Sequence, residues 1–301
     1  IMADMGFTLS QTTWTFSLAI LMLGLSAGFL GSFAEKIGPK KSGLLAMLFW
    51  VTGLLGTAYA LSIHNLTLLY LFYGIIGGIG LGIGYITPVS TLVKYFPNRP
   101  GFATGLAIMG FGFASLIAGP LMQFLVAQFG LVNNFIILGV IYLVIMGTSS
   151  LYLKAPQLKQ PTQTTKDKST MYVHNHGMLA NDAIKTWQFG ALWWVFFINI
   201  TCGIGLLSLA SPMAQEAIGM TPAAAASLVG IIGIFNGGGR IAWSTISDYL
   251  GRAQTYILFF IIEIIAFYLL AQTNSALTFQ ILILLIITCY GGGFSCMPAY
   301  L

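Results

Sequence analysis

The stretch GSFAEKIGPKK, residues 31–41, has a partial second copy, STISDYLGR, at residues 244–252. In each copy an acid stands three positions before a glycine: Glu35 before Gly38, and Asp248 before Gly251. Each copy follows one long apolar run and precedes another. The acid is expected to end one helix, the glycine to make a tight turn, and the basic residues to anchor the turn at the inner membrane surface. The repeat predicts two related halves in parallel orientation.

The composition is that of a membrane protein. Of the 301 residues, 57% are hydrophobic and only 6% are charged, whereas soluble domains carry about 25% charged residues. Runs of roughly 20 mostly apolar residues recur, which is the length that crosses a ~30 Å hydrocarbon core as a helix. A β-barrel would show short alternating segments instead. We therefore predict an all-α membrane protein. The expected spans are Thr13–Phe33, Ser42–Leu61, Leu66–Leu92, Phe102–Leu125, Phe135–Leu153, Phe189–Leu209, Ala223–Ile246, Thr255–Leu270 and Ala276–Pro298.

The basic residues indicate the orientation of these spans. All twelve lysines and arginines except Arg240 fall in loops that alternate with loops free of Lys and Arg. Because cytoplasmic loops carry the excess of positive charge, the basic loops are predicted to face the cytoplasm and the N-terminus to lie outside. The net charge of +5 therefore reflects topology, and we expect the lipid bilayer, but no nucleic acid, as a partner.

The sequence shows no evident cluster of catalytic or metal-binding residues. Cys202, Cys289 and Cys296 lie in apolar segments without the spacing of metal ligands, which is typical of small buried side chains. Paired catalytic carboxylates and nucleotide-binding loops are also missing from the sequence. We expect neither an enzyme nor a bound cofactor or metal.

Glycines recur at four-residue spacing in the third span, at Gly74, Gly78 and Gly82 and again at Gly80 and Gly84. In a membrane, small residues at this spacing let helix backbones approach closely. The pattern therefore predicts tight packing of the third span against its neighbours.

The third and ninth spans are expected to be interrupted at matched positions near their cytoplasmic ends. The interruptions are GIGYITP at residues 82–88 and YGGGFSCMP at residues 290–298. Glycine and proline interruptions in corresponding spans of two halves indicate a substrate cavity. The aromatic candidates there are Tyr85, Tyr290 and Phe294, for each of which plain packing is an equal alternative.

Arg240 is the basic residue that topology does not explain. It lies eight residues before Asp248, ~12 Å along a helix at a rise of about 1.5 Å per residue. A charge facing lipid at this depth costs at least ~2.5 kcal/mol, so Arg240 should face an aqueous cavity or a counter-ion. Its planar fork of donors matches a carboxylate. We interpret Arg240 as an anion-binding residue, with a structural ion pair as the alternative, and expect glycines 237–239 to clear space beside it.

Glu263 is the other charged residue within a span. It could be protonated, pair with a neighbouring helix or mediate proton coupling. A structural or protonated acid is favoured over coupling.

The loop at residues 31–41 resembles the cytoplasmic signature of the major facilitator superfamily, G-x-x-x-D-[RK]-x-G-x-[RK]-[RK]. Gly31, Lys36, Gly38, Lys40 and Lys41 match it, and Glu35 replaces the aspartate. The resemblance implies two pseudo-symmetric six-helix halves. Here residues 1–153 would hold helices 2–6 and residues 188–301 helices 7–10, with a polar cytoplasmic linker at 154–187. The chain would then be a fragment lacking helices 1, 11 and 12.

In that superfamily the loop acts as a latch between the halves in the outward-open state. The resemblance therefore implies a gating role for the matching positions, with helix capping as the plainer alternative. These positions are Gly31, Glu35, Lys36, Gly38, Lys40, Lys41, Asp248, Gly251 and Arg252.

FNGGGR with W-x-x-x-S-D-x-x-G-R, and GYITP through YFPNRPGFATG, are similar to the oxalate/formate antiporter family. In these carriers an arginine of helix 8 and a lysine of helix 11 hold the substrate carboxylates within an aromatic cage. Arg240 sits at the helix 8 position and Tyr85 matches a cage tyrosine of helix 4. Tyr290 and Phe294 stand where the family has Trp and Tyr, which puts oxalate itself in doubt more than carboxylates in general. The helix 11 position lies beyond Leu301.

The sequence therefore predicts a secondary carrier of small carboxylates, an antiporter of the oxalate/formate type that works by alternating access about a central site. We expect a monomer in a bacterial cytoplasmic membrane. One alternative is a proton-coupled monocarboxylate symporter for lactate or pyruvate. An alternative of another class is a membrane sensor that does not transport, although the linker is too short and polar to be an output domain.

Overall fold

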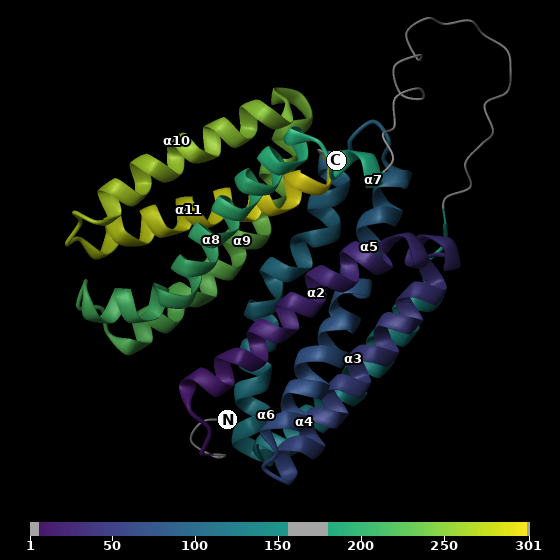
Figure 1. Cartoon of the computed structure of the whole chain (residues 1–301). Coiled ribbons are helices and arrows are strands. Elements are labelled where there is room, and N and C mark those ends of the chain that lie inside the picture. Colours follow the sequence, from purple (N-terminus) through teal and green to yellow (C-terminus); the bar gives the residue numbers. More distant parts are fainter. Residues whose placement is uncertain (1–5, 156–179, 300–301) are drawn as a thin grey trace, which may run out of the picture. The chain divides into compact units, whose positions relative to one another are not determined.

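The computed structural model describes residues 6–155 and 180–299. The chain divides into two compact units, Ile1–Ala155 and Pro156–Leu301, which run from purple to teal and from green to yellow in Figure 1. The predicted linker, residues 154–187, lies for the most part outside the described residues. Its described end contains the short helix α7 (Ala180–Ala183).

The N-terminal unit consists of helices alone within its described residues. They are α2 (Leu9–Ile37), α3 (Pro39–Ser62), α4 (Leu66–Leu69), the π-helical η1 (Tyr70–Gly77), α5 (Gly78–Tyr95) and α6 (Pro100–Tyr152). Thr8 caps α2 through a reciprocal hydrogen-bonded box with Gln11, and Asn65 caps α4. Such polar caps satisfy backbone N–H groups that a helix start leaves free.

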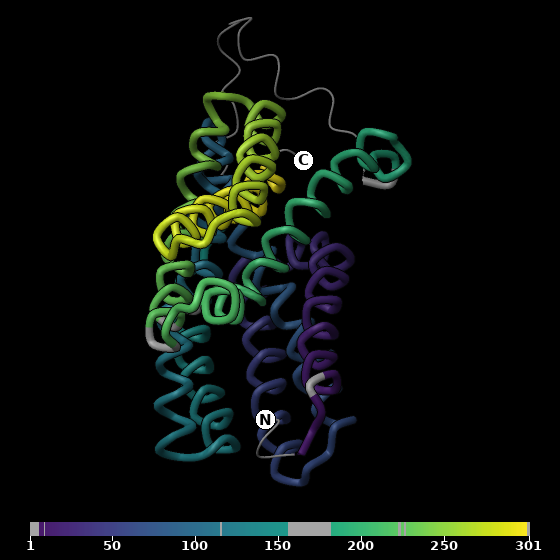
Figure 2. Tube along the Cα trace, turned by 90° about the vertical axis from the view of Figure 1, so that its left-hand side faces the viewer, coloured from purple at the N-terminus to yellow at the C-terminus, as the bar shows by residue number. Residues whose placement is uncertain are grey.

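The C-terminal unit is a bundle around its last long helix. Its elements are α8 (Trp187–Glu216), α9 (Pro222–Leu250), α10 (Arg252–Leu270), α11 (Ala276–Cys296) and the 3₁₀ turn η2 (Met297–Ala299). Helix α11 packs against α8, α9 and α10, and α10 and α11 run side by side in Figures 1 and 2. More than half of the residues in the most apolar stretch of α11 are buried, so α11 is the core helix of this unit.

Seven described helices are long and apolar enough to cross a membrane, which confirms the all-α membrane fold. The expected spans differ from them in two places. The fourth and fifth spans fall within the single 53-residue stretch α6. The expected span Ala223–Ile246 is a helix, α9, but it is not among the seven.

The expected loop around Asn133 is reduced to one residue, Gly130. This residue takes φ 81° and ψ 168°, a conformation almost confined to glycine, and divides α6 into rods 100–129 and 131–152. Helix α6 begins at Pro100, shortly after α5 ends at Tyr95. Just after α6 ends, the carbonyl of Lys154 accepts a 3.0 Å hydrogen bond from Tyr95 Oη. The two rods therefore start and finish at the same end of the unit and form a hairpin.

The predicted interruption of the third span at residues 82–88 is wrong. Helix α5 continues through Pro88 to Tyr95. Proline removes one backbone donor, and the helix nevertheless continues past it. Thr87 and Thr91, on either side of Pro88, donate to the carbonyls of Ile83 and Thr87 at 2.7 Å. The irregular part of this span is the π-helical η1 instead. In the ninth span the α-helix ends at Cys296 and continues as η2.

The glycine pattern of the third span is confirmed as a packing device. A Cβ at Gly74, Gly78 or Gly82 would lie within 3.0 Å of atoms of α2, namely Leu18, Ala19 and Ser26. A Cβ at Gly80 would lie 2.6 Å from the backbone nitrogen of Trp50 in α3. One set of glycines therefore lets α2 approach the span, and Gly80 admits α3 on another side.

Candidate functional site

Arg240 lies in the middle of α9 and is only 3% exposed. Its Nε donates a 3.2 Å hydrogen bond to Oδ1 of Asn236, one helical turn earlier. Ser244 and Ser295 both donate to the carbonyl oxygen of Arg240, Ser295 at 2.8 Å from α11. Both the backbone and the side chain of Arg240 are thus held by neighbouring polar groups within the C-terminal unit.

An aromatic ring lies beside the guanidinium. Cζ of Arg240 stands 4.7 Å from the ring centroid of Phe294 in α11, within the range of a cation–π contact. Phe294 is supported in turn by Phe196 of α8, at 5.6 Å between ring centroids. The predicted site residues Arg240 and Phe294 are therefore in direct contact.

Tyr290 is buried on α11, one helical turn before Phe294. It interacts electrostatically with Arg240. Its ring fills the space beside Gly203 of α8, where a Cβ would lie 2.1 Å from Cδ2 of the tyrosine. Tyr290 is thus near Arg240, and its ring also packs the interface between α8 and α11.

Three consecutive glycines let α11 pass through the centre of the unit at the level of Arg240. A Cβ at Gly291 would meet the Asn236 carbonyl of α9 at 2.5 Å, and one at Gly293 would meet Oδ1 of Asn199 of α8 at 2.2 Å. A Cβ at Gly292 would lie 2.6 Å from Trp243 of α9 and 2.9 Å from Phe259 of α10. Because successive residues of a helix project about 100° apart, the three glycines make α11 narrow on every side.

Of the three glycines 237–239 of α9, Gly238 has open space where a Cβ would stand, whereas Gly239 has a different role from the one expected. A Cβ at Gly239 would lie 2.6 Å from the carbonyl oxygen of Thr288 in α11. Trp243 Nε1, one turn later, donates a 3.2 Å hydrogen bond to Oγ1 of the same threonine. Gly239 therefore brings α9 and α11 together rather than clearing space beside Arg240.

Glu263 is buried in α10, at 4% exposure. Asn199 of α8 donates from Nδ2 to its Oε1 at 3.3 Å. The structure thus gives Glu263 a polar partner on a neighbouring helix.

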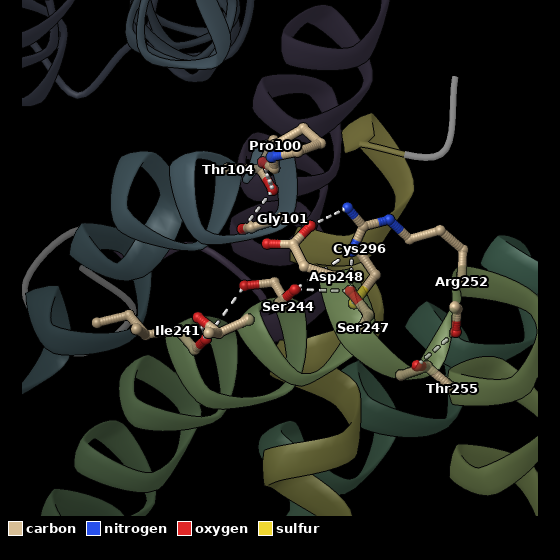
Figure 3. Close-up of polar contacts among 12 residues, drawn as sticks. Pro100, Gly101, Thr104, Ile241, Ser244, Ser247, Asp248, Arg252, Thr255 and Cys296 are labelled. Atoms are coloured by element: carbon tan, nitrogen blue, oxygen red, sulfur yellow. Dashed lines mark hydrogen bonds and ion pairs between the residues drawn. The ribbon is translucent and has the colours of Figure 1, made fainter. Parts of the chain in front are cut away.

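The second copy of the repeat forms a compact polar cluster where α9 meets α10, shown in Figure 3. The guanidinium of Arg252 pairs with the carboxylate of Asp248 and donates to Ser247 Oγ and, at 3.2 Å, to the carbonyl of Ser244. Cys296 of α11 lies 3.4 Å from Ser247 Oγ. The side chains of Arg252 and Asp248 are only 14% and 7% exposed, so this ion pair is largely shielded from solvent.

The first copy forms the equivalent turn with a more exposed ion pair. Glu35 at the end of α2 pairs with Lys94 of α5, and both side chains are about half exposed. Gly38 takes φ 83° and ψ 160°, and Gly251 in the second copy takes φ 93° and ψ 146°. The two glycines make the same kind of turn between consecutive helices.

The other residues of the first copy lie around this turn. Gly31 faces Ile86 of α5, whose Cγ1 would be 3.8 Å from an added Cβ. Lys36 occupies the last turn of α2, and Lys40 and Lys41 the first turn of α3. The structure thus gathers the whole signature at one end of the N-terminal unit.

Tyr85 belongs to α5 of the N-terminal unit. Its ring packs edge-on against Phe111 of α6, with 5.8 Å between centroids. The structure places it in an aromatic pair within its own unit.

A separate apolar groove of about 470 Å³ lies between α8 and α10. Its lining includes Cys202, Leu206, Met213 and Phe267. The residues around Arg240 are not among those that line it, so it is distinct from the candidate site.

Sequence reasoning missed the residues that support Arg240 and Phe294. Asn236 could have been found, because it stands four residues before Arg240, and side chains at this spacing share a helix face. Phe196, Asn199 and Ser295 come from other helices, and their contacts depend on how α8 and α11 pack. Single-sequence patterns carry no signal for such long-range contacts.

The chain was compared with known proteins. A family model described as Major Facilitator Superfamily matches residues 1–301. The uncharacterized MFS-type transporter YhjX of Escherichia coli (strain K12) is 27% identical over 301 residues, which cover 99% of this chain and 72% of that protein. The oxalate:formate antiporter of Oxalobacter formigenes is 25% identical over 302 residues, which cover 98% of this chain and 69% of that protein.

Of two further matches, one covers part of the chain and the other concerns its fold. Human monocarboxylate transporter 12 is 33% identical over 135 residues, 43% of this chain and 25% of that protein. The crystal structure of the MFS transporter FucP in the outward conformation matches with a TM-score of 0.62 at 16% identity, covering 97% of this chain and 80% of that one. The latter match shows the fold alone.

Proposed function

The chain belongs to the major facilitator superfamily, and we propose that it is a secondary carrier of small organic carboxylates. As a member of that superfamily it is a multi-pass membrane transporter with an all-α fold. The proposed mode is antiport of the oxalate/formate type, by alternating access. Two relatives that span most of the chain support the carboxylate class by name, the oxalate:formate antiporter and the apicoplast pyruvate carrier 1 of Toxoplasma gondii.

The proposal depends on the geometry of Arg240. The side chain is buried halfway along a membrane helix, where a charge is costly and normally functional. Asn236 holds Nε, and the Phe294 ring lies beside Cζ, so the plane of the guanidinium is set before a substrate arrives. A guanidinium fixed in this way binds a carboxylate with two parallel hydrogen bonds. Little ordering entropy is then lost on binding.

The predicted aromatic residues complete the proposed site. Phe294 contacts the guanidinium, and Tyr290 supplies a hydroxyl in the same part of the unit. Phe294 has no hydroxyl, so this position cannot donate a hydrogen bond to a second carboxylate. That favours monocarboxylates such as formate, lactate or pyruvate, which need only one strong cation. Tyr85 is proposed as the contribution of α5.

Substitution of Arg240 tests the proposal. The full-length protein is reconstituted in liposomes preloaded with formate, oxalate or lactate, and uptake of the labelled carboxylate is measured. Arg240→Gln should reduce uptake at least about a hundredfold, because a buried charge-assisted contact is worth several kcal/mol. Arg240→Lys keeps the charge but not the fork and should recover only part of the uptake.

The matched control is Lys185→Gln, which neutralises a side chain that is 77% exposed and should leave uptake unchanged. Thermal unfolding shows whether each variant is folded. Full uptake by folded Arg240→Gln would exclude Arg240 as the binding cation.

Proton-coupled symport is the second candidate. The match to human monocarboxylate transporter 12 over 135 residues supports monocarboxylates as its substrate class. Uptake that needs a pH gradient and no internal carboxylate would establish symport, whereas uptake that needs internal carboxylate and no gradient would establish antiport.

A further inference from the structure

Glu263 has an ionisable side chain that is not part of the proposed substrate site. It is 4% exposed and lies in the middle of the membrane-spanning helix α10. An ionised side chain at such depth is expensive unless it is paired. Its hydrogen-bond partner in the described part of the chain is the neutral amide of Asn199.

One hydrogen-bond acceptor of Asn199 is left unsatisfied within the described part of the chain. Asn199 is fully buried and donates from Nδ2 to Glu263. Among the described residues, its Oδ1 has no hydrogen-bond partner, and an orphan buried acceptor is costly. A carboxyl group that carries its proton has one O–H donor. Such a group can donate to the amide oxygen while it accepts from the amide nitrogen, and the pair is then uncharged.

The pair joins two neighbouring helices of the bundle. Helices α8 and α10 both pack against α11, and the Asn199–Glu263 hydrogen bond connects them. The Asn199 side chain occupies the space beside Gly293, where a Cβ would lie 2.2 Å from its Oδ1. Tyr256 of α10 donates a 2.5 Å hydrogen bond to the Gly293 carbonyl. Gly293 is therefore held by α8 and by α10.

Gly293 is next to the candidate site in the chain. Gly293 directly precedes Phe294, whose ring lies beside the guanidinium of Arg240. Any shift of α11 at Gly293 moves this ring. The contact also depends on size, because a Cβ at residue 293 would displace the Asn199 side chain.

We propose that Glu263 is a positioning residue that acts as an uncharged hydrogen-bonding side chain. With Asn199 it forms an acid–amide clasp that fixes Gly293 and thereby Phe294 beside Arg240. The functional part of this inference rests on the proposed carboxylate site. Among the described residues, two thiols interact with Glu263, Cys202 of α8 and Cys289 of α11, and neither offers a positive charge.

Hydrogen–deuterium exchange of the purified full-length protein tests the clasp without any substrate. Glu263→Leu and Asn199→Ala each remove one half of it, and the backbone amides of residues 291–296 should exchange about tenfold faster as local opening becomes easier. Glu263→Gln has the donors and acceptors of the protonated acid and should exchange like the wild type. Unchanged exchange in both disrupted variants would overturn the clasp, whatever the protein transports.

Uptake in liposomes tests the link to Phe294. Glu263→Leu should raise the KM for the carboxylate about tenfold with a smaller effect on kcat, and the increase should vanish in a Phe294→Ala background if Glu263 acts through that ring. Glu263→Gln should keep the KM and the pH profile of the wild type.

Two results would overturn the functional part. One is an equal effect of Glu263→Leu with and without Phe294. The other is loss of uptake in Glu263→Gln with normal exchange of α11, which would make Glu263 a proton carrier. Absence of carboxylate uptake by the wild type would refute the proposed function instead, and the exchange result would still decide the clasp.

Discussion

At the scale of single residues, the helix packing of the C-terminal unit depends on glycines, which have no side chain, as much as on larger residues. Gly291, Gly292 and Gly293 allow α9, α10 and α8 to approach α11 together. Membrane helices gain no hydrophobic free energy from leaving lipid for each other, so van der Waals contact at small residues drives their association. Around Arg240 this close approach also fixes where the guanidinium and the Phe294 ring lie.

Gly203→Ala should destabilise the protein through this effect. The new methyl would meet the Tyr290 ring at 2.1 Å, and overpacking of a tight interface costs about 1–3 kcal/mol. Thermal unfolding in detergent should show a lower Tm, by several degrees.

Gly205→Ala is the matched control two residues further along α8. Gly205 is exposed, and an added Cβ there meets no described atom within 4 Å. Its Tm should stay the same or rise, because alanine is the better helix former. Equal Tm values for both variants would contradict the packing argument.

The sequence predicted Arg240 and Phe294 but not the residues that support them. A lone arginine in an apolar run is visible because it breaks a pattern. Asn199 and Phe196 break no pattern, and their importance comes from contacts with Glu263 and Phe294, which are remote in the chain. Gly239 was misread for the same reason, since only the position of α11 shows what faces it.

At the scale of elements, the two copies of the repeat are turns of the same geometry. Gly38 ends α2 and begins α3, and Gly251 does the same for α9 and α10, both with positive φ and ψ near 150°. This backbone region is essentially restricted to glycine. The spacing of acid and glycine in the sequence was sufficient to predict these turns, because their conformation is local.

Gly38→Ala and Gly251→Ala should each lower stability by about 1–3 kcal/mol, the cost of a strained residue in this region. Asparagine, which tolerates ordinary left-handed turns, should not rescue either position. The control is Gly28→Ala in the interior of α2, which has open space for a Cβ. Thermal unfolding is the measurement, and a Gly38→Asn variant as stable as the wild type would show that the turn is not strained.

The irregular elements were not predictable in the same way. The π-helical η1 lies in YLFYGIIG, whose composition suits an ordinary helix. Helix α3 packs against η1, and a Cβ at Gly53 of α3 would meet the Gly77 backbone at 2.8 Å. Such close approach is decided by the packed neighbours and not by local preference.

At the scale of the whole molecule, charge predicts orientation. In the N-terminal unit the Glu35–Lys94 pair and the Tyr95–Lys154 hydrogen bond bring the ends of α2, α5 and α6 together, so these basic segments share one end. The orientation of that end towards the cytoplasm follows from the positive-inside rule and remains a prediction.

Labelling of single cysteines in a background without native cysteines measures the orientation. Lys40→Cys, at the basic turn, should react with an impermeant maleimide only in inside-out vesicles. Asn274→Cys, between α10 and α11, should react only in right-side-out vesicles. Both positions are exposed. The reverse pattern would show that the chain is inserted the other way round.

The single-residue connection at Gly130 also bears on how the protein is made. Two rods joined by a single residue have no flexible loop that would let them separate. We therefore expect rods 100–129 and 131–152 to enter the bilayer together as a helical hairpin.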